Sequence, residues 1–465
     1  AALQGDATGD DVAALHDALD SLFTDKKAIM AILRNKTPAE REAILDRYKE
    51  QYGKDLHEHL HDELSGDARD RADALMKGDV NLADSIAIKQ SETGKWYGGA
   101  DIKDLDAVYA EVRKEVEADA ARRHMTTAEV EAEIKRRGRQ METQYNSTFG
   151  KGDPNAMRNH FESAFSNAEK DRAFALADND RVAMDSSAIR MESESLYTDD
   201  DKVLELLMKQ RERAETDVRR DTLLNFNEQA DKEKWSPEVR KQKWEEMNKE
   251  AEKKIDEKAN QNLANLEKTY DKKYSMGWGL GALTAVVELE MSGNEQEMAR
   301  ALRKKDKEGN YISGAKVPFE DMAFWAVDGL GTNEWLLDKA IKGRSKEELK
   351  TMRENYKKKH PGRDLDEDVL GDVSGRDEWD MGQALKGEPE TPEDRLQRMN
   401  ENVGYETSGK AGFGQVFAGE ETEVLKNTSE NANWAYKRYN DAVKKYGKDS
   451  PEAKAQLERF ERWTG

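Results

Sequence analysis

The stretch "YKEQYGKDL" at residues 48–56 indicates a repeat fold, because copies of it recur along the chain. The nearest copy is "YKKKHPGRDL" at 356–365, and looser ones are "YDKKYSMGWGL" at 270–280 and "YNSTFGKGDP" at 145–154. Each copy precedes a predicted helix that ends in a small polar pair, within "DELSGD", "GDVSGR", "LEMSGN" and "ESAFSN". Such self-similarity is typical of repeat proteins, whose units bury their apolar faces by stacking.

The segments upstream of these copies match as well. "DSLFTDKKAI" at 20–29 and "ESLYTDDDKV" at 194–203 are near copies, and "WYGGADIKDL" and "DGLGTNEWLL" occupy the same place in the other two units. We therefore predict an all-α array of four units, each reading as helix, loop, helix, short helix, helix, helix. The predicted units are 1–80, 81–180, 181–306 and 316–389, followed by a linker and helical extension at 390–465.

The third unit carries an additional polar segment at residues 212–261. Ser236 followed by Pro237 is a helix-start signal, with serine as the cap and proline in the first turn. We predict two long helices that form an antiparallel hairpin, and the alternative is a charged, solvated spacer without a partner. The second unit has a smaller extension around 114–135.

Composition limits the classes of function. The chain has 465 residues, of which 37% are charged, and its formal net charge is −21. A polyanion repels nucleic acid, and it repels anionic lipid unless a cation intervenes. Cysteine is absent, which excludes disulfides, thiol catalysis and cysteine-ligated zinc. No apolar run predicts a transmembrane helix or a signal peptide. From the missing initiator methionine we expect either a processed chain or an excised piece of a longer one.

The order of these motifs resembles the annexin repeat, four of which make an annexin core. The resemblance covers residues 7–389 and is strongest in the first and fourth units, weaker in the third and weakest in the second. It implies a slightly curved all-α disc with five helices per repeat, whose convex face binds phospholipid through calcium. The large insertions resemble the scattered bacterial members of the family more than the animal ones.

The fourth unit contains the best candidate for a calcium loop, "VDGLGT" at 327–332. Calcium takes six to eight oxygen ligands, and glycine allows backbone carbonyls to converge because it adopts positive φ at little cost. The family pattern implies carbonyl ligands from Val327, Gly329 and Gly331, with the carboxylate of Asp372 as the capping ligand. Asp372 lies 40 residues after Thr332 (372 − 332 = 40). The alternative is a glycine turn that only joins two helices.

The first and third units keep the capping acid but lose the glycines. Phe23 and Tyr197 replace the second glycine, and an aromatic residue resists positive φ. Glu63 and Glu290 occupy the capping position, and Glu63 lies 39 residues after Thr24 (63 − 24 = 39). We expect degenerate loops here, which leaves Glu63 and Glu290 as weaker calcium candidates.

The second unit departs furthest from the pattern. Ala100 stands in place of the threonine, and Ala164 aligns with the capping acid. Calcium is least expected here. Trp96 and Tyr97 form either an exposed pair at a lipid interface or ordinary packing.

Three other motifs resemble binding sites, but we do not interpret them as such. The histidines of "HEHLH" at 57–61 are expected on a solvated helix face. "DLDEDVLGD" at 364–372 resembles a helix–loop–helix calcium loop but has Val369 where glycine is required. "GKAGFGQV" at 409–416 resembles a kinase phosphate loop, but no other kinase motif accompanies it.

The sequence therefore predicts an annexin-like module that binds anionic phospholipid membranes through calcium, chiefly at the fourth unit. The alternative is a non-catalytic structural or protein-interaction scaffold of a larger protein, with the 212–261 hairpin or the tail as partner surface. An enzyme is the least supported class, since no nucleophile–base pair or phosphate loop is evident. We expect no nucleic-acid partner.

Overall fold

The computed structural model describes residues 7–21, 24–34, 36–93, 100–194, 198–275, 282–328, 332–407 and 419–464. The regular structure of these residues is helical, with one isolated β-bridge between Lys305 and Tyr311. The all-α fold class is therefore confirmed. No helix in these ranges is long and apolar enough to cross a membrane.

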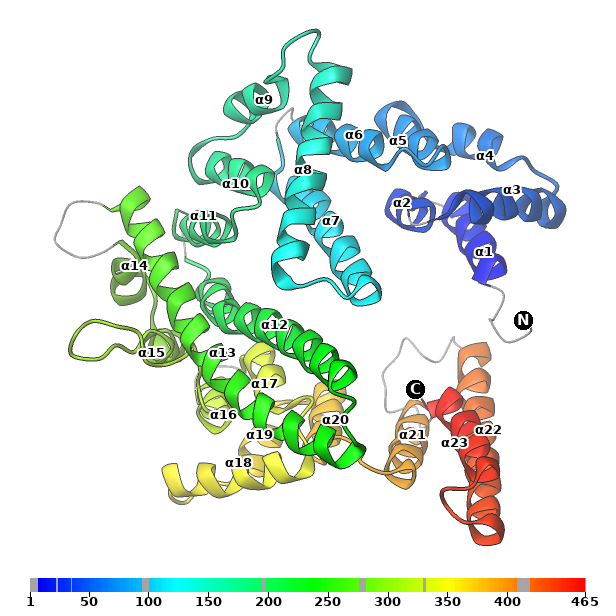
Figure 1. The fold of residues 1–465 in the computed structure, drawn as a ribbon, viewed down its shortest axis with the longest axis vertical. Coiled ribbons are helices and arrows are strands. Elements are labelled where there is room, and N and C mark those ends of the chain that lie inside the picture. The colour runs from blue at the N-terminus through cyan, green and yellow to red at the C-terminus, as the bar shows by residue number, and fades with distance from the viewer. Residues whose placement is uncertain are drawn as a thin grey trace. The chain divides into compact units, whose positions relative to one another are not determined.

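Within the described residues, five helical segments fall in each predicted repeat (Figure 1). The first repeat contains α1 (Ala7–Asp20), α2 (Lys26–Arg34), α3 (Pro38–Tyr52), α4 (Leu56–Glu63) and α5 (Gly66–Met76). The second contains α6 (Val80–Thr93), α7 (Ile102–Arg123), α8 (Thr127–Phe149), α9 (Ala156–Ala164) and α10 (Asn167–Asp178). The third contains α11 (Arg181–Ser193), α12 (Asp200–Lys232), α13 (Pro237–Tyr274), α14 (Ala282–Ala285) continued by the π-helical turn η1 (Val286–Glu290), and α15 (Gly293–Leu302). The fourth contains α16 (Phe319–Val327), α17 (Glu334–Ile341), α18 (Lys346–Lys359), α19 (Leu365–Asp372) and α20 (Gly375–Ala384).

The third helix of a repeat is longer than the short helix we predicted. In α3, Thr37 Oγ1 accepts a hydrogen bond from Glu40 N, and the Glu40 carboxylate accepts one from Thr37 N. This capping box starts a helix of 15 residues that ends only at Gly53, where φ is 66°. The fourth helix is the short one, with eight residues in both α4 and α19.

The opening tyrosine of the repeated motif explains why it recurs. Tyr48, Tyr145, Tyr270 and Tyr356 are all fully buried. Each packs in a tilted or edge-on geometry against the ring four residues later, on the same helix face, with ring centroids 5.0 to 5.2 Å apart. The first helix of the repeat covers that second ring in turn: His16 and Phe324 stack at 3.7 Å on Tyr52 and His360. Lys89 and Arg190 lie over the rings of Phe149 and Tyr274.

The described chain divides into two compact units. One comprises residues 1–291 and 302–315, and the other comprises 292–301 and 316–465. Most of α15 therefore groups with the fourth repeat, although by sequence it is the fifth helix of the third repeat. Asn294 shows this, since its side chain donates to the carbonyls of Trp325 and Asp328 at 3.0 and 2.6 Å.

The segment 212–261 contains the second part of α12 and the first part of α13. These two helices pack together as a helical hairpin. The cap signal is confirmed, because Ser236 Oγ accepts from Val239 N and Pro237 occupies the first turn. Small side chains such as Ala214 and Ala251 are buried along the hairpin. Ion pairs such as Arg219–Glu252 at 2.6 Å join the two helices on the outside.

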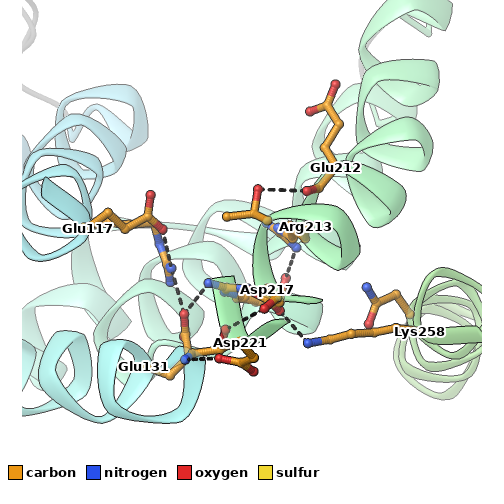
Figure 2. A network of polar contacts seen from close by, with 12 residues as sticks. Glu117, Glu131, Glu212, Arg213, Asp217, Asp221 and Lys258 are labelled. Carbon is orange, nitrogen blue, oxygen red and sulfur yellow. Dashed lines mark hydrogen bonds and ion pairs between the residues drawn. The ribbon is translucent and has the colours of Figure 1, made fainter. Parts of the chain in front are cut away.

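The extension of the second repeat contacts the base of this hairpin (Figure 2). Thr127, the first residue of α8, donates from its backbone N to Asp221 Oδ1 at 2.8 Å. Its hydroxyl donates to the Asp217 carbonyl at 3.1 Å. The Asp217 carboxylate pairs with Lys258 at 2.8 Å, so one network includes α8, α12 and α13.

The tail is more helical than predicted. The region 390–465, predicted as a linker and helical extension, contains α21 (Pro392–Thr407), α22 (Gly419–Tyr446) and α23 (Pro451–Thr464). Ala432, Ala435 and Phe460 are fully buried where the three helices meet. The segment "GKAGFGQV" lies outside the described residues.

Candidate metal centre

The structure brings the threonine of the fourth-repeat loop to the predicted capping acid. Thr332 Oγ1 donates to Asp372 Oδ2 at 2.6 Å and lies 2.7 Å from the Asp372 carbonyl oxygen. Val327 is the last residue of α16 and is buried. Gly329 and Gly331 lie outside the described residues. The loop ends at Asn333, which caps α17 and whose backbone N donates to Ala326 O at 2.9 Å.

The same pair recurs in two other repeats. Thr24 Oγ1 donates to Glu63 Oε2 at 3.1 Å, and Thr198 Oγ1 donates to Glu290 Oε2 at 3.4 Å. Phe23 and Tyr197 lie outside the described residues. The threonine and acid are thus neighbours in three repeats, as equivalent positions should be.

The second repeat lacks the pair, because Ala100 has no hydroxyl and Ala164 has no carboxylate. Its loop is also longer. Asp101 N donates to Ser91 O ten residues earlier (101 − 91 = 10), whereas Asp25 N donates to Ala18 O seven residues earlier (25 − 18 = 7). Trp96 and Tyr97 lie outside the described residues.

A basic residue fixes the acid at the start of the loop, which sequence reasoning missed. Arg363 Nη1 lies 2.7 Å from Asp328 Oδ1, and the equivalent Lys54 Nζ lies 3.6 Å from Asp20 Oδ1. The hydrogen bond to Asp328 raises the pKa of Arg363 above its ordinary value, so the pair stays charged. The signal was present in "YGKDL" and "PGRDL", where the basic residue precedes the aspartate in both repeats.

The third repeat presents its capping acid on a distorted helix. The π-helical turn η1 ends at Glu290, and such turns often occur at functional sites. Leu289, directly before Glu290, is 72% exposed.

The donors at the fourth-repeat loop are all oxygens, which suits calcium. Among the described residues, no three histidine, aspartate or glutamate side chains gather in a group that could hold a metal ion. A centre here would therefore need backbone carbonyl ligands beside the Asp372 carboxylate. Of the predicted ligands, the Asp372 carboxylate lies at the end of the loop, where it accepts a hydrogen bond from Thr332.

The prediction that the histidines of "HEHLH" lie on a solvated helix face is wrong for one of them. His59 is buried, and its Nδ1 lies 2.6 Å from the Tyr48 hydroxyl. His61 pairs with Asp73 at 2.9 Å on the exposed face. Residues 365–372 form helix α19, which agrees with rejecting a helix–loop–helix calcium loop there.

Comparison with known proteins gives a sequence match in the first repeat. The annexin family model, "Annexin", matches residues 10–74. Annexin A13 of Mus musculus is 44% identical over 66 residues, which are 14% of this chain and 21% of that protein. Annexin A13 of Homo sapiens is 40% identical over 73 residues, or 16% and 23% of the two chains. The match therefore spans about a fifth of the length of these relatives.

Solved structures similar to this chain include chicken annexin V in complex with Zn²⁺ and calcium-bound alpha-14 giardin. The first is 16% identical with a TM-score of 0.23, covering 83% of this chain and 98% of that one. The second is 15% identical with a TM-score of 0.22, covering 82% and 100%. The likeness to annexins in sequence is confined to the first repeat, and the buried tyrosine of that repeat recurs in the other three. Residues 10–74 of the chain are therefore similar to the annexin family.

Proposed function

We propose that this chain binds anionic phospholipid membranes through calcium, chiefly at the fourth-repeat loop. The observation that supports this is the contact between Thr332 and Asp372, which brings a carboxylate to the loop that contains Gly329 and Gly331. Asp372 would hold the ion together with backbone carbonyls of Val327, Gly329 and Gly331. A bound calcium ion would add positive charge and accept a lipid phosphoryl oxygen in a remaining coordination position.

The net charge makes this attachment dependent on calcium. At −21, the chain is repelled by an anionic bilayer. No catalytic role is proposed, because lipid attachment of this kind needs only the ion, its oxygen ligands and the membrane surface.

Co-sedimentation with phosphatidylserine vesicles tests the proposal. The wild-type chain should pellet in calcium and stay in the supernatant with a chelator. Asp372→Ala should need about tenfold more calcium or worse, since it removes a charged ligand. Asp377→Ala is the matched control, because Asp377 is an exposed acid near the start of α20 with no role in the loop.

Two outcomes are separable. If Glu63→Ala or Glu290→Ala abolishes pelleting and Asp372→Ala does not, the membrane function stands and the loop assignment is wrong. If the wild-type chain pellets at no calcium concentration, the membrane function itself is wrong.

A second function is favoured by the turn of the α12–α13 hairpin. Phe226 packs against Trp235 and Trp244, with ring centroids 5.7 and 5.0 Å apart. Beside these rings, Leu223 is 48% and Val239 39% exposed. Apolar and aromatic side chains gathered on the end of a charged hairpin form a contact surface of the type found in protein interfaces.

The position of this cluster favours a protein over a membrane. The 33 residues of α12 span about 50 Å, and the helix begins directly after Thr198. The cluster therefore lies at the opposite end of α12 from the Thr198–Glu290 pair. We propose that it binds an apolar patch on a protein partner while that repeat's loop remains available to a membrane.

Capture from cell extract by variants of the hairpin tests this. Leu223→Asp with Val239→Asp should lose a protein that the wild-type chain retains. Asn227→Asp with Gln242→Asp adds the same charge at exposed positions and should retain it. The captured protein, once purified, should bind the wild-type chain directly. Equal capture by both double variants excludes the hairpin as the partner surface.

A further inference from the structure

A cavity of about 360 Å³ lies in the first compact unit, between α7, α8, α10, α11 and α12. Pockets for small molecules have volumes of roughly 300 to 1,000 Å³. Five basic side chains line it: Arg113, Arg172, Arg181, Lys209 and Arg213. Four acidic side chains line it as well: Asp106, Glu117, Glu212 and Asp217. The lining alone carries one more cation than anions, and two carboxylates behind it, Glu131 and Asp185, also pair with the arginines.

The arginines around the cavity are held in place by carboxylates. The pairs are Arg172–Asp106 at 2.7 Å, Arg113–Glu131 at 3.0 Å, Arg213–Asp185 at 3.0 Å and Arg181–Asp217 at 3.4 Å. Glu131 also contacts Arg181, so two guanidinium groups share one carboxylate. Figure 2 shows Glu131, Arg213 and Asp217 within this network. These guanidinium groups are fixed before any ligand arrives.

Lys209 is the exception among the five. It is half-buried, and within the described part of the chain its ammonium group has no carboxylate within ion-pair distance and no hydrogen-bond acceptor. Burial lowers the pKa of Lys209, and the charge of Arg213 lowers it further. An ammonium group in this position is unfavourable without a counter-ion. An anion in the cavity would compensate it.

The remaining wall is apolar and includes Tyr109, Leu176 and Met184. We propose that this cavity binds a small phosphate-bearing organic molecule, with the phosphate at Lys209 and the organic part against the apolar wall. Phosphate suits the site better than a carboxylate, because several oxygens and up to two charges can engage Lys209 and the fixed arginines together. The inference is independent of the calcium loops and goes beyond membrane attachment.

Titration calorimetry of the full chain, with calcium chelated, tests the inference. The probes are inorganic phosphate, glycerol 3-phosphate, and vesicles containing phosphatidic acid. Lys209→Met should weaken binding about tenfold or more, since a charge-assisted hydrogen bond is lost. Lys202→Met, an exposed lysine on the same helix, should bind as the wild type does. Ala110→Trp, at an exposed lining position, should weaken glycerol 3-phosphate more than inorganic phosphate.

Comparing the soluble probes with the vesicles identifies the source of the phosphate. Binding of the soluble probes that is lost in Lys209→Met assigns a free phosphate compound. Binding only to vesicles, lost in the same variant, assigns a lipid headgroup. If Lys209→Met binds as tightly as the wild type, or the wild type binds none of the probes, the inference is overturned. Circular dichroism of each variant separates lost binding from lost folding.

Discussion

The single residues expected to matter most for the free energy of unfolding are those with buried charges. Arg34 and Asp84 join the first two repeats, and their side chains are 4% and 0% exposed. Arg34 Nη2 donates to Asp84 Oδ2 at 2.9 Å, and Arg34 also contacts Glu115. Burial alone would lower the pKa of Arg34, but the two carboxylates raise it above its ordinary value. The guanidinium therefore stays charged and depends on both partners.

Replacing Asp84 should accordingly destabilise the first unit. Asp84→Ala leaves Arg34 buried with Glu115 alone and should lower the free energy of unfolding by about 3–5 kcal/mol. Urea denaturation measures the change. Asp67→Ala removes a partly exposed acid that lies 3.4 Å from Lys89, and should cost no more than about 1 kcal/mol. Equal losses in the two variants would contradict this account of the buried pair.

Part of the candidate site was predictable at the residue scale. The spacing from Thr332 to Asp372 (40 residues) is one residue longer than that from Thr24 to Glu63 (39 residues), and both pairs are in contact. Arg363 was missed, because an ion pair between positions 35 residues apart depends on how two helices pack. Carbonyl ligation by Gly329 and Gly331 stays a prediction.

At the scale of elements, the order of the helices was predicted from the recurring motifs, and the start of α13 from Ser236 and Pro237. The capping boxes Thr37–Glu40 and Ser345–Glu348 start α3 and α18 at equivalent places in two repeats. The length of the third helix was wrong, because no residue between Thr37 and Gly53 stops the helix. α21 was missed because its polar sequence gains stability from packing, through contacts such as Trp379 stacked on Tyr405 at 4.4 Å.

Other elements could not be predicted from local sequence at all. The π-helical turn before Glu290 and the position of α15 both depend on tertiary contacts. Asn294 binds carbonyls of the fourth repeat, and no motif in "SGNEQEMARAL" indicates this. The greater length of the second-repeat loop was not predicted either, because it is evident only from the hydrogen bond between Asp101 N and Ser91 O.

The whole molecule separates its candidate loops between the two compact units. The Thr24–Glu63 and Thr198–Glu290 pairs belong to one unit, and the Thr332–Asp372 pair belongs to the other. A ligand that binds only the native state stabilises the unit that holds it. Thermal unfolding can therefore locate the calcium site without a membrane.

Scanning calorimetry should show that calcium raises the unfolding temperature of the unit with the fourth repeat and leaves the other nearly unchanged. At a hundredfold excess over Kd, binding contributes about 2.7 kcal/mol, or roughly 5–10 °C for a unit of this size. Asp372→Ala should abolish the shift, and Asp377→Ala should keep it. If both units unfold together, amide exchange of α16–α20 gives the same comparison. A shift confined to the other unit would contradict the assignment of the site to Asp372. It would favour Glu63 or Glu290, whose loops lack glycine.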